Sequence, residues 1–130
     1  MPRILIADDK ETSRELLRVV LEKSGYAVIE ASDGGDAIEK ARAEKPDLIL
    51  LDLQMPIFNG YEVLQQLRHD ARFALVPIIA LTASAMQGDR EKALAAGFTA
   101  HLAKPVALAE LRAEIQRLLA PAASAARKTD

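Results

Sequence analysis

Short aliphatic runs recur along the chain and are separated by longer segments in which apolar and polar residues mix. The two clearest runs are Ile4–Ala7 and Leu48–Leu51. A run of about four aliphatic residues is too short for a helix and suits a strand that is buried on both faces. The pattern predicts five strands, and the other three are expected at Tyr26–Ile29, Val76–Leu81 and Phe98–Leu102.

The longer segments carry apolar residues at helical spacing and predict five helices. In the first, Leu16, Leu17, Val20 and Leu21 form such a stripe, and Gly25 follows where a left-handed C-cap is expected. The helices are expected at Glu11–Ser24, after an N-cap at Ser32-Asp33, at Tyr61–Asp70, from a cap at Ser84 to Gly97, and at Ala107–Leu119.

The fourth and fifth of these helices have features of their own. Gly88 and many alanines lie in the fourth. We expect this helix to be the least firmly packed, because glycine weakens a helix and alanine buries little surface. Pro121 is expected to end the fifth helix. The residues that follow are small and polar, so we expect one domain over 1–120 and a disordered tail over 121–130.

Strand and helix alternate five times, which predicts an α/β fold with a doubly wound parallel sheet and right-handed crossovers. The alternative in this class is a dinucleotide-binding fold, which needs a G-x-G-x-x-G turn after the first strand. Here that turn is Asp8-Asp9-Lys10-Glu11. Two carboxylates would repel a pyrophosphate, so the turn argues against dinucleotide binding.

Composition narrows the range of functions. Lys and Arg number 17 against 19 Asp and Glu, a net charge of -2, which argues against general affinity for nucleic acid or anionic membranes. No apolar run approaches the ~20 residues of a membrane span, and no signal peptide is visible. The absence of cysteine excludes disulfides and thiolate chemistry. We expect a cytoplasmic protein that inserts into no membrane and binds no nucleic acid directly.

Polar side chains follow four of the five predicted strands. Asp8 and Asp9 follow the first strand and Asp52 the third. Thr82 follows the fourth and Lys104 nearly the fifth, so all should meet at one edge of the sheet. Three neighbouring carboxylates need a cation, and oxygen ligands of high charge favour Mg²⁺. With a metal and an ammonium to neutralise phosphoryl oxygens, Asp52 is suited to be the nucleophile of a phosphoryl transfer.

These segments together carry a family resemblance over about residues 3–119. The matching residues, in order and spacing, are Asp8-Asp9, Leu51–Pro56 with Gly60, Pro77–Ala83 and Lys104-Pro105. In them the chain resembles the receiver domain of bacterial two-component response regulators. The resemblance implies a flavodoxin-like (βα)5 fold with strand order 2-1-3-4-5. It also implies that Asp52 receives its phosphoryl group from a phosphohistidine on a sensor histidine kinase or a histidine phosphotransfer protein.

The resemblance also implies roles for the other residues of the site. Asp9 and Asp52 would bind Mg²⁺ directly. Asp8 would act through water, and the backbone carbonyl of Gln54 would complete the protein ligands. Lys104 would pair with the phosphoryl group, and the peptide bond between it and the following proline is cis in the family.

Two further residues would form the switch that responds to phosphorylation. Thr82 would move towards the phosphoryl group. The family usually carries Tyr or Phe three residues before the lysine, and this ring swings inward with the threonine. His101 occupies that position here. It either rotates as the ring does or stays a half-exposed histidine without a switching role, and both interpretations remain open at this point.

The resemblance and the short tail predict a single-domain response regulator. It would catalyse its own phosphorylation and slow dephosphorylation without being an enzyme for a separate substrate. The face formed by the fourth helix, the fifth strand and the last helix would bind a downstream target protein, or the domain would relay the phosphoryl group. The alternative is a Mg²⁺-dependent phosphohydrolase that forms an aspartyl phosphate. That class needs a second acid two residues after the nucleophile, where this chain has Gln54.

Overall fold

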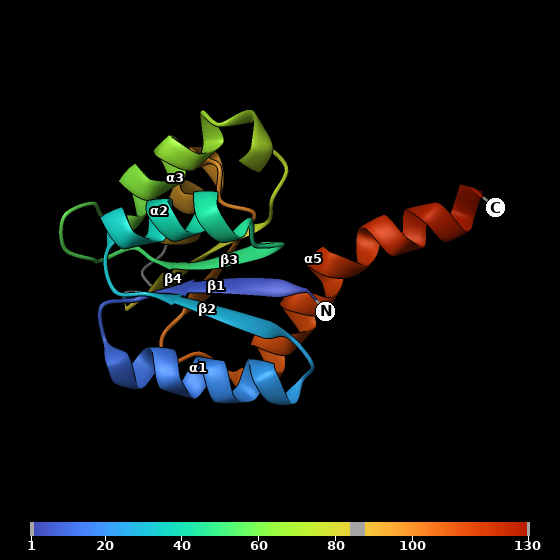
Figure 1. Cartoon of the computed structure of the whole chain (residues 1–130), viewed down its shortest axis with the longest axis horizontal. Coiled ribbons are helices and arrows are strands. Elements are labelled where there is room, and N and C mark those ends of the chain that lie inside the picture. Colours follow the sequence, from blue (N-terminus) through green and yellow to red (C-terminus); the bar gives the residue numbers. More distant parts are fainter. Residues whose placement is uncertain (1, 84–87, 130) are drawn as a thin grey trace.

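Five parallel strands form one sheet, and helices pack against both of its faces (Figure 1). The computed structural model describes residues 2–83 and 88–129. The strand order is β2-β1-β3-β4-β5, which confirms the predicted flavodoxin-like topology. In chain order the elements are β1 (Arg3–Ala7), α1 (Glu11–Lys23), β2 (Ala27–Ala31), α2 (Gly34–Glu44), β3 (Leu48–Asp52), α3 (Gly60–Arg68), the 3-10 helix η1 (Ala71–Phe73), β4 (Ile78–Thr82), α4 (Asp89–Ala96), β5 (Ala100–Ala103) and α5 (Leu108–Thr129).

The sheet separates two hydrophobic cores. Helices α2, α3 and α4 cover one face, and α1 and α5 cover the other. Side chains alternate between the faces, so β1, β2, β3 and β4 contribute to both cores, whereas β5 contributes Ala100 and Leu102 to the second. Every residue of β3 and β4 is buried, as a strand covered on both sides requires. The first core includes Leu5, Ile49, Leu51, Leu64, Leu67, Phe73 and Phe98, and the second includes Ile4, Ile6, Leu21, Leu50, Ile79, Leu111 and Ile115.

Local signals begin and end several helices as their sequences predict. Asp33 is the N-cap of α2, and its side chain accepts a hydrogen bond from an amide of the first turn at 2.7 Å. After α1, Gly25 adopts the left-handed conformation with a φ of +95°. Asn59 and Glu62 form a capping box that makes Gly60 the first residue of α3. This box fixes how the chain leaves β3 and enters α3.

Three strands begin later than predicted. β4 begins at Ile78, where the pattern indicated Val76. β2 covers Ala27–Ala31 and β5 covers Ala100–Ala103, so each lies nearer to the carboxyl terminus than the aliphatic pattern indicated. The amide of Phe98 donates to the carbonyl of Ala93 at 3.1 Å, which closes the end of α4 before β5 begins. An apolar residue in a turn can therefore extend a strand-like pattern beyond the strand itself.

The buried stripe of α1 is narrower than predicted. Leu17 and Leu21 are buried, whereas Leu16 is 56% exposed. Successive residues of a helix are rotated by about 100° around its axis, so Leu16 points away from the sheet beside its buried neighbour. The side chains of α1 that pack on the sheet thus lie one full turn apart.

The last two helices differ from the predictions. α4 begins at Asp89, and the predicted cap Ser84 lies outside the described residues. Ala93 is the buried residue of α4, which fits the expected weak packing. α5 continues through Pro121 to Thr129, so the prediction that this proline ends the helix is wrong (Figure 1). Proline removes one backbone donor, but the alanine-rich sequence after it has high helix propensity. The division into a domain over 1–120 and a disordered tail over 121–130 stays a prediction.

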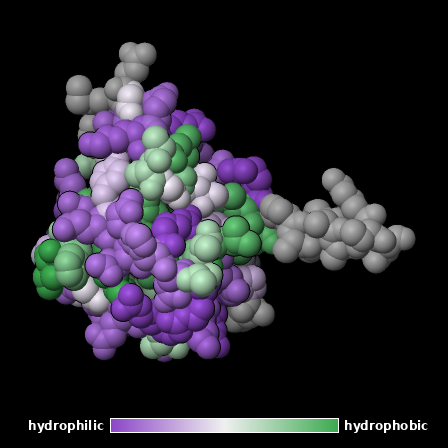
Figure 2. All heavy atoms as spheres, turned by 90° about the horizontal axis from the view of Figure 1, so that it is seen from above, coloured by the Kyte–Doolittle hydropathy of each residue, from purple (hydrophilic) through white to green (hydrophobic). Residues whose placement is uncertain are grey.

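The surface is largely hydrophilic on the face shown in Figure 2, and its hydrophobic side chains form small separate groups. In the described part of the chain, the exposed large apolar residues are Leu16, Val19, Ile57, Leu75 and Leu94. None of the described helices combines the length and the apolar character that crossing a bilayer requires.

Gly60 gives a test of how closely α3 packs against the end of β3. A Cβ at this position would lie 2.6 Å from the backbone oxygen of Asp52 and 2.8 Å from the Cα of Leu53. Gly60→Ala should lower the free energy of unfolding by about 1–3 kcal/mol, because backbone atoms cannot move aside as a flexible side chain can. Urea denaturation measures this change.

Gly35→Ala is the matched control, since it also lies in the first turn of a helix. The nearest atom to a Cβ there is Asp33 Oδ1 at 3.4 Å, which is ordinary contact. It should change stability by less than about 1 kcal/mol. Equal unfolding midpoints for Gly60→Ala and the wild type would show that the backbone at the end of β3 leaves room for a Cβ at position 60.

Candidate functional site

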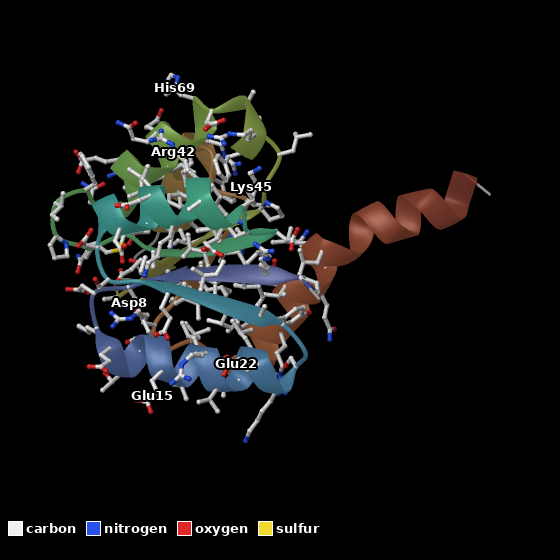
Figure 3. All side chains as sticks on the ribbon, in the orientation of Figure 1. Asp8, Glu15, Glu22, Arg42, Lys45 and His69 are labelled. Atoms are coloured by element: carbon white, nitrogen blue, oxygen red, sulfur yellow. The ribbon has the colours of Figure 1, made fainter. Side chains whose placement is uncertain are left out.

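The carboxyl ends of the strands bring together the side chains that the sequence singled out. Asp52 is the last residue of β3 and is paired in register with Leu81 of β4. Thr82 ends β4 opposite Ala103 of β5. Asp8 directly follows β1, and Figure 3 shows it at this end of the sheet, beside the start of α1.

Three carboxylates form the centre of the site. One oxygen atom from each of Asp8, Asp9 and Asp52 lies within 4.8 Å of the other two. Asp8 and Asp52 are buried, with 0% and 4% of their surface exposed, whereas Asp9 is exposed. Backbone amides orient the buried pair. Lys10 N–H donates to Asp8 Oδ1 at 2.9 Å, and Gln54 N–H donates to Asp52 Oδ1 at 3.0 Å.

The ammonium of Lys104 joins the two buried carboxylates. Its Nζ lies 2.7 Å from Asp8 Oδ2 and 3.0 Å from Asp52 Oδ2. The Lys104 amide donates to the Thr82 carbonyl at 2.7 Å, which ties the end of β5 to the end of β4. The peptide bond to Pro105 is cis, as the resemblance implied. Residues from three separate parts of the chain thus meet around one positive charge.

The site holds more negative than positive charge. Burial raises the pKa of Asp52 above its ordinary value of 3.8, and the charge of Asp8 adds to this, although the Gln54 amide and Lys104 oppose it. Burial acts to lower the pKa of Lys104, but its hydrogen bonds and charge interactions with Asp8 and Asp52 outweigh this effect and raise the pKa. One ammonium is shared by several carboxylates, so a bound cation would relieve the excess charge.

The donor set suits a hard divalent cation. All three acids offer oxygen atoms, and their spacing could hold a metal ion. Because Asp9 is exposed, a cation that keeps several waters can reach the cluster from solvent. Gln54 is exposed and lies two residues beyond the last residue of β3. Its backbone N–H donates a hydrogen bond to the Asp52 carboxylate. Its expected role as a carbonyl ligand stays a prediction.

Thr82 and His101 lie on the same face of the sheet. Leu81 and Leu102 pack into the core beneath α1 and α5, and side chains alternate along a strand. Thr82 and His101 therefore face the side of the sheet that α4 covers. Thr82 is buried and His101 is half-buried. The Nε2 atom of His101 is buried and has no hydrogen-bond partner among the described residues.

Sequence reasoning missed one residue that contacts the acidic loop. Arg14 Nη1 donates to the backbone carbonyl of Asp8 at 2.7 Å. Its Nε donates to Glu30 Oε1 at 3.3 Å. Arg14 belongs to α1 and Glu30 to β2, so no local pattern shows that they meet. The available signal was weak, namely an arginine on the helix that begins at the acidic turn.

Known proteins are similar to this chain over most of its length. A family model described as the response regulator receiver domain matches residues 4–116. The polar-differentiation response regulator DivK of Brucella anthropi is 39% identical over 109 residues, which cover 83% of this chain and 89% of the relative. The match to DivK thus extends over nearly the whole length of both proteins.

Two solved structures are similar in both fold and sequence. The chemotaxis response regulator CheY4 of Vibrio cholerae has a TM-score of 0.85 and 30% identity, and the match covers 91% of this chain and 98% of that one. The receiver domain of the sensor histidine kinase PA1611 from Pseudomonas aeruginosa, solved with a magnesium ion coordinated in its active site cleft, has a TM-score of 0.83 and 38% identity over 90% and 96% of the two chains. The chain therefore belongs to the family of response regulator receiver domains.

Proposed function

We propose that this receiver domain accepts a phosphoryl group on Asp52 in a Mg²⁺-dependent reaction. The observation that carries the proposal is the convergence of three carboxylates at the carboxyl edge of the sheet, two of which, Asp8 and Asp52, contact Lys104. Asp52 is the member that ends the central strand β3. Its carboxylate is held by the Gln54 amide on one oxygen and by Lys104 on the other.

The chemistry that we propose is attack by a carboxylate oxygen of Asp52 on the phosphorus of a phosphohistidine. A P–O bond forms as the P–N bond breaks, and the imidazole leaves with a proton from solvent, so an acyl phosphate remains on Asp52. Lys104 is placed to turn from Asp52 towards the phosphoryl oxygens while keeping its contact with Asp8. The same site would release phosphate slowly when water replaces the histidine.

The proposed ligands of Mg²⁺ are oxygen atoms of this edge. Asp9 and Asp52 would bind the ion directly, Asp8 through water, and Gln54 through its backbone carbonyl. Support comes from the spacing of the acidic cluster and from the magnesium ion of the PA1611 receiver domain, which is 38% identical. When bound, Mg²⁺ would neutralise charge on the transferring phosphoryl group.

The partners that we propose are a sensor histidine kinase or a histidine phosphotransfer protein as donor and a downstream target protein as receiver of the signal. We propose the cytoplasm as the place of the reaction. Docking on a target and relay of the phosphoryl group are both compatible with the site.

The signal would leave the site through Thr82 and the α4–β5–α5 face. Thr82 ends β4 beside Asp52, and His101 faces the same side from β5. We propose that His101 fills the space that Thr82 vacates when it moves to the phosphoryl group. The weak packing of α4, with Ala93 as its buried residue, allows this helix to shift in response.

The phosphohydrolase alternative is not favoured. Gln54 occupies the position where that class carries its second acid, and its side chain has no carboxylate to play that part. Membership of the receiver family over residues 4–116 also indicates a signalling domain.

Phosphorylation is tested directly with acetyl phosphate and Mg²⁺. The wild type should gain the mass of one phosphoryl group, and Asp52→Asn or addition of EDTA should abolish the gain. Asp47→Asn is the matched control, because this aspartate precedes the same strand but contacts the Arg3 amide instead, at 2.8 Å. A label that persists in Asp52→Asn would overturn the assignment.

The stability of the metal-free protein should depend on ionised Asp52 in a defined direction. Burial raises the pKa of Asp52 above 3.8, so the ionised group destabilises the folded state as pH rises through and above that value. Asp52→Asn should therefore unfold at a higher temperature than the wild type near neutral pH, and its advantage should shrink as pH falls towards 3.8.

Added Mg²⁺ should reverse this order, because a ligand at 100 times its Kd stabilises the protein that binds it by about 2.7 kcal/mol. Thermal unfolding followed by circular dichroism, with EDTA and then with Mg²⁺, measures both effects. An Asp52→Asn variant that is less stable than the wild type in EDTA at neutral pH would contradict the expected cost of the charge.

The switching face is tested by amide chemical shifts before and after phosphorylation. Beyond the site itself, shifts should change in α4, β5 and the first half of α5, because His101 of β5 faces α4 while Leu102 of the same strand lies in one core with Leu111 of α5. His101→Ala should reduce the changes in α4 while leaving those next to Asp52. Changes confined to residues 26–43 would contradict the proposed route.

A further inference from the structure

Both backbone polar groups of Asp8 are held by hydrogen bonds. The Asp8 amide donates to the Ala31 carbonyl at 3.1 Å. The Asp8 carbonyl accepts from Arg14 Nη1 at 2.7 Å, and the Arg14 side chain is only 15% exposed. The carbonyl of Asp8 belongs to the same planar peptide as the amide of Asp9. Arg14 therefore fixes the plane from which the Asp9 side chain projects.

Asp9 depends on this backbone contact more than its neighbours do. Asp8 and Asp52 have carboxylates bonded to Lys104 and to backbone amides. Among the described residues, the exposed Asp9 carboxylate has neither a hydrogen bond nor an ion pair of this kind. Its direction in the metal-free protein is thus set by the backbone to which it is attached.

Arg14 is itself held in place by Glu30. Its Nε lies 3.3 Å from Glu30 Oε1, and Arg18 Nε lies 3.3 Å from the other oxygen of the same carboxylate. Lys40 Nζ donates to the backbone carbonyl of Glu30. These charged groups line a polar cleft between α1, the end of β2 and α2. Arg14, which lines this cleft, therefore links the edge strand β2 to the loop that carries Asp8 and Asp9.

We infer that Arg14 is the positioning residue of the metal-binding loop, a role that rests on the proposed Mg²⁺ site. It does not touch the metal. The guanidinium bridges the Glu30 carboxylate and the Asp8 carbonyl with two different N–H groups, and in this way it keeps Asp9 aimed at the cluster formed with Asp52. A planar, multiply donating guanidinium can do this, whereas the single ammonium of lysine cannot make the same bridge.

Charge and position predict opposite effects, which makes the inference testable. A positive charge near the cluster repels a cation, so removing it would by itself strengthen Mg²⁺ binding. Loss of the bridge to the Asp8 carbonyl would weaken binding, because residues that orient metal ligands typically contribute about 10–100-fold to affinity. The sign of the change therefore separates the two roles.

The experiment is titration of Mg²⁺ into the metal-free protein, followed by calorimetry. Arg14→Met should bind Mg²⁺ at least about tenfold more weakly than the wild type. Arg14→Lys keeps the charge, is less disruptive to folding, and should also bind more weakly. Arg18→Met is the matched control: it removes the other ion pair of Glu30 one turn along α1 but no contact with Asp8, and should bind like the wild type.

A second measurement needs no metal. The amide resonances of Asp9 and Lys10 should shift or broaden in metal-free Arg14→Met and Arg14→Lys and stay in place in Arg18→Met. If the wild type binds Mg²⁺ and both Arg14 variants bind it equally well or more tightly, the positioning role is wrong and the proposed function stands. If the wild type itself binds no Mg²⁺, the proposed function fails and this inference fails with it.

Discussion

The interaction on which the site depends is the pair of contacts from the Lys104 ammonium to Asp8 and Asp52, at 2.7 and 3.0 Å. Without that charge, two buried carboxylates would face each other out of water, a costly arrangement. The ammonium reaches them because β5 ends beside β4, where the Lys104 amide is bonded to the Thr82 carbonyl. Lys104 therefore does two things: its backbone ties the end of β5 to the end of β4, and its side chain compensates the charge of the buried carboxylates.

Compensation by Lys104 is incomplete, and the proposed chemistry of the site depends on this incompleteness. Burial still raises the pKa of Asp52, so its carboxylate carries a charge that the folded protein stabilises poorly. A group in this condition gains from a divalent cation, and it also gains from sharing its charge with a phosphoryl group that Lys104 and the cation can bind. Stability given up in the resting state is thus recovered in the loaded states that the domain is proposed to reach.

The elements around this edge differ in how firmly they are packed. β3 and β4, which carry Asp52 and Thr82, are buried along their whole length and cannot move independently. α4 contributes Ala93 as its buried residue and is the element that a small displacement can shift. We therefore propose that a charge on these strands would be transmitted to α4 past His101, whose Nε2 has no hydrogen-bond partner in the described part of the chain.

The sequence by itself determined the strand pattern, the doubly wound class and the chemical identity of the site, because buried strands need aliphatic runs and phosphoryl transfer needs acids and an amine at strand ends. It also determined caps such as Asp33 and Gly25, which depend on neighbouring residues alone. Tertiary structure decided which residues touch: the 2.7 Å contact of Lys104 with Asp8 joins positions 96 apart, and Arg14 meets Glu30 across two elements. Periodicity could not exclude Leu16 from the core of α1, nor show that helix continues past Pro121. Local patterns record the preferences of short segments, whereas such contacts depend on how the segments pack in space.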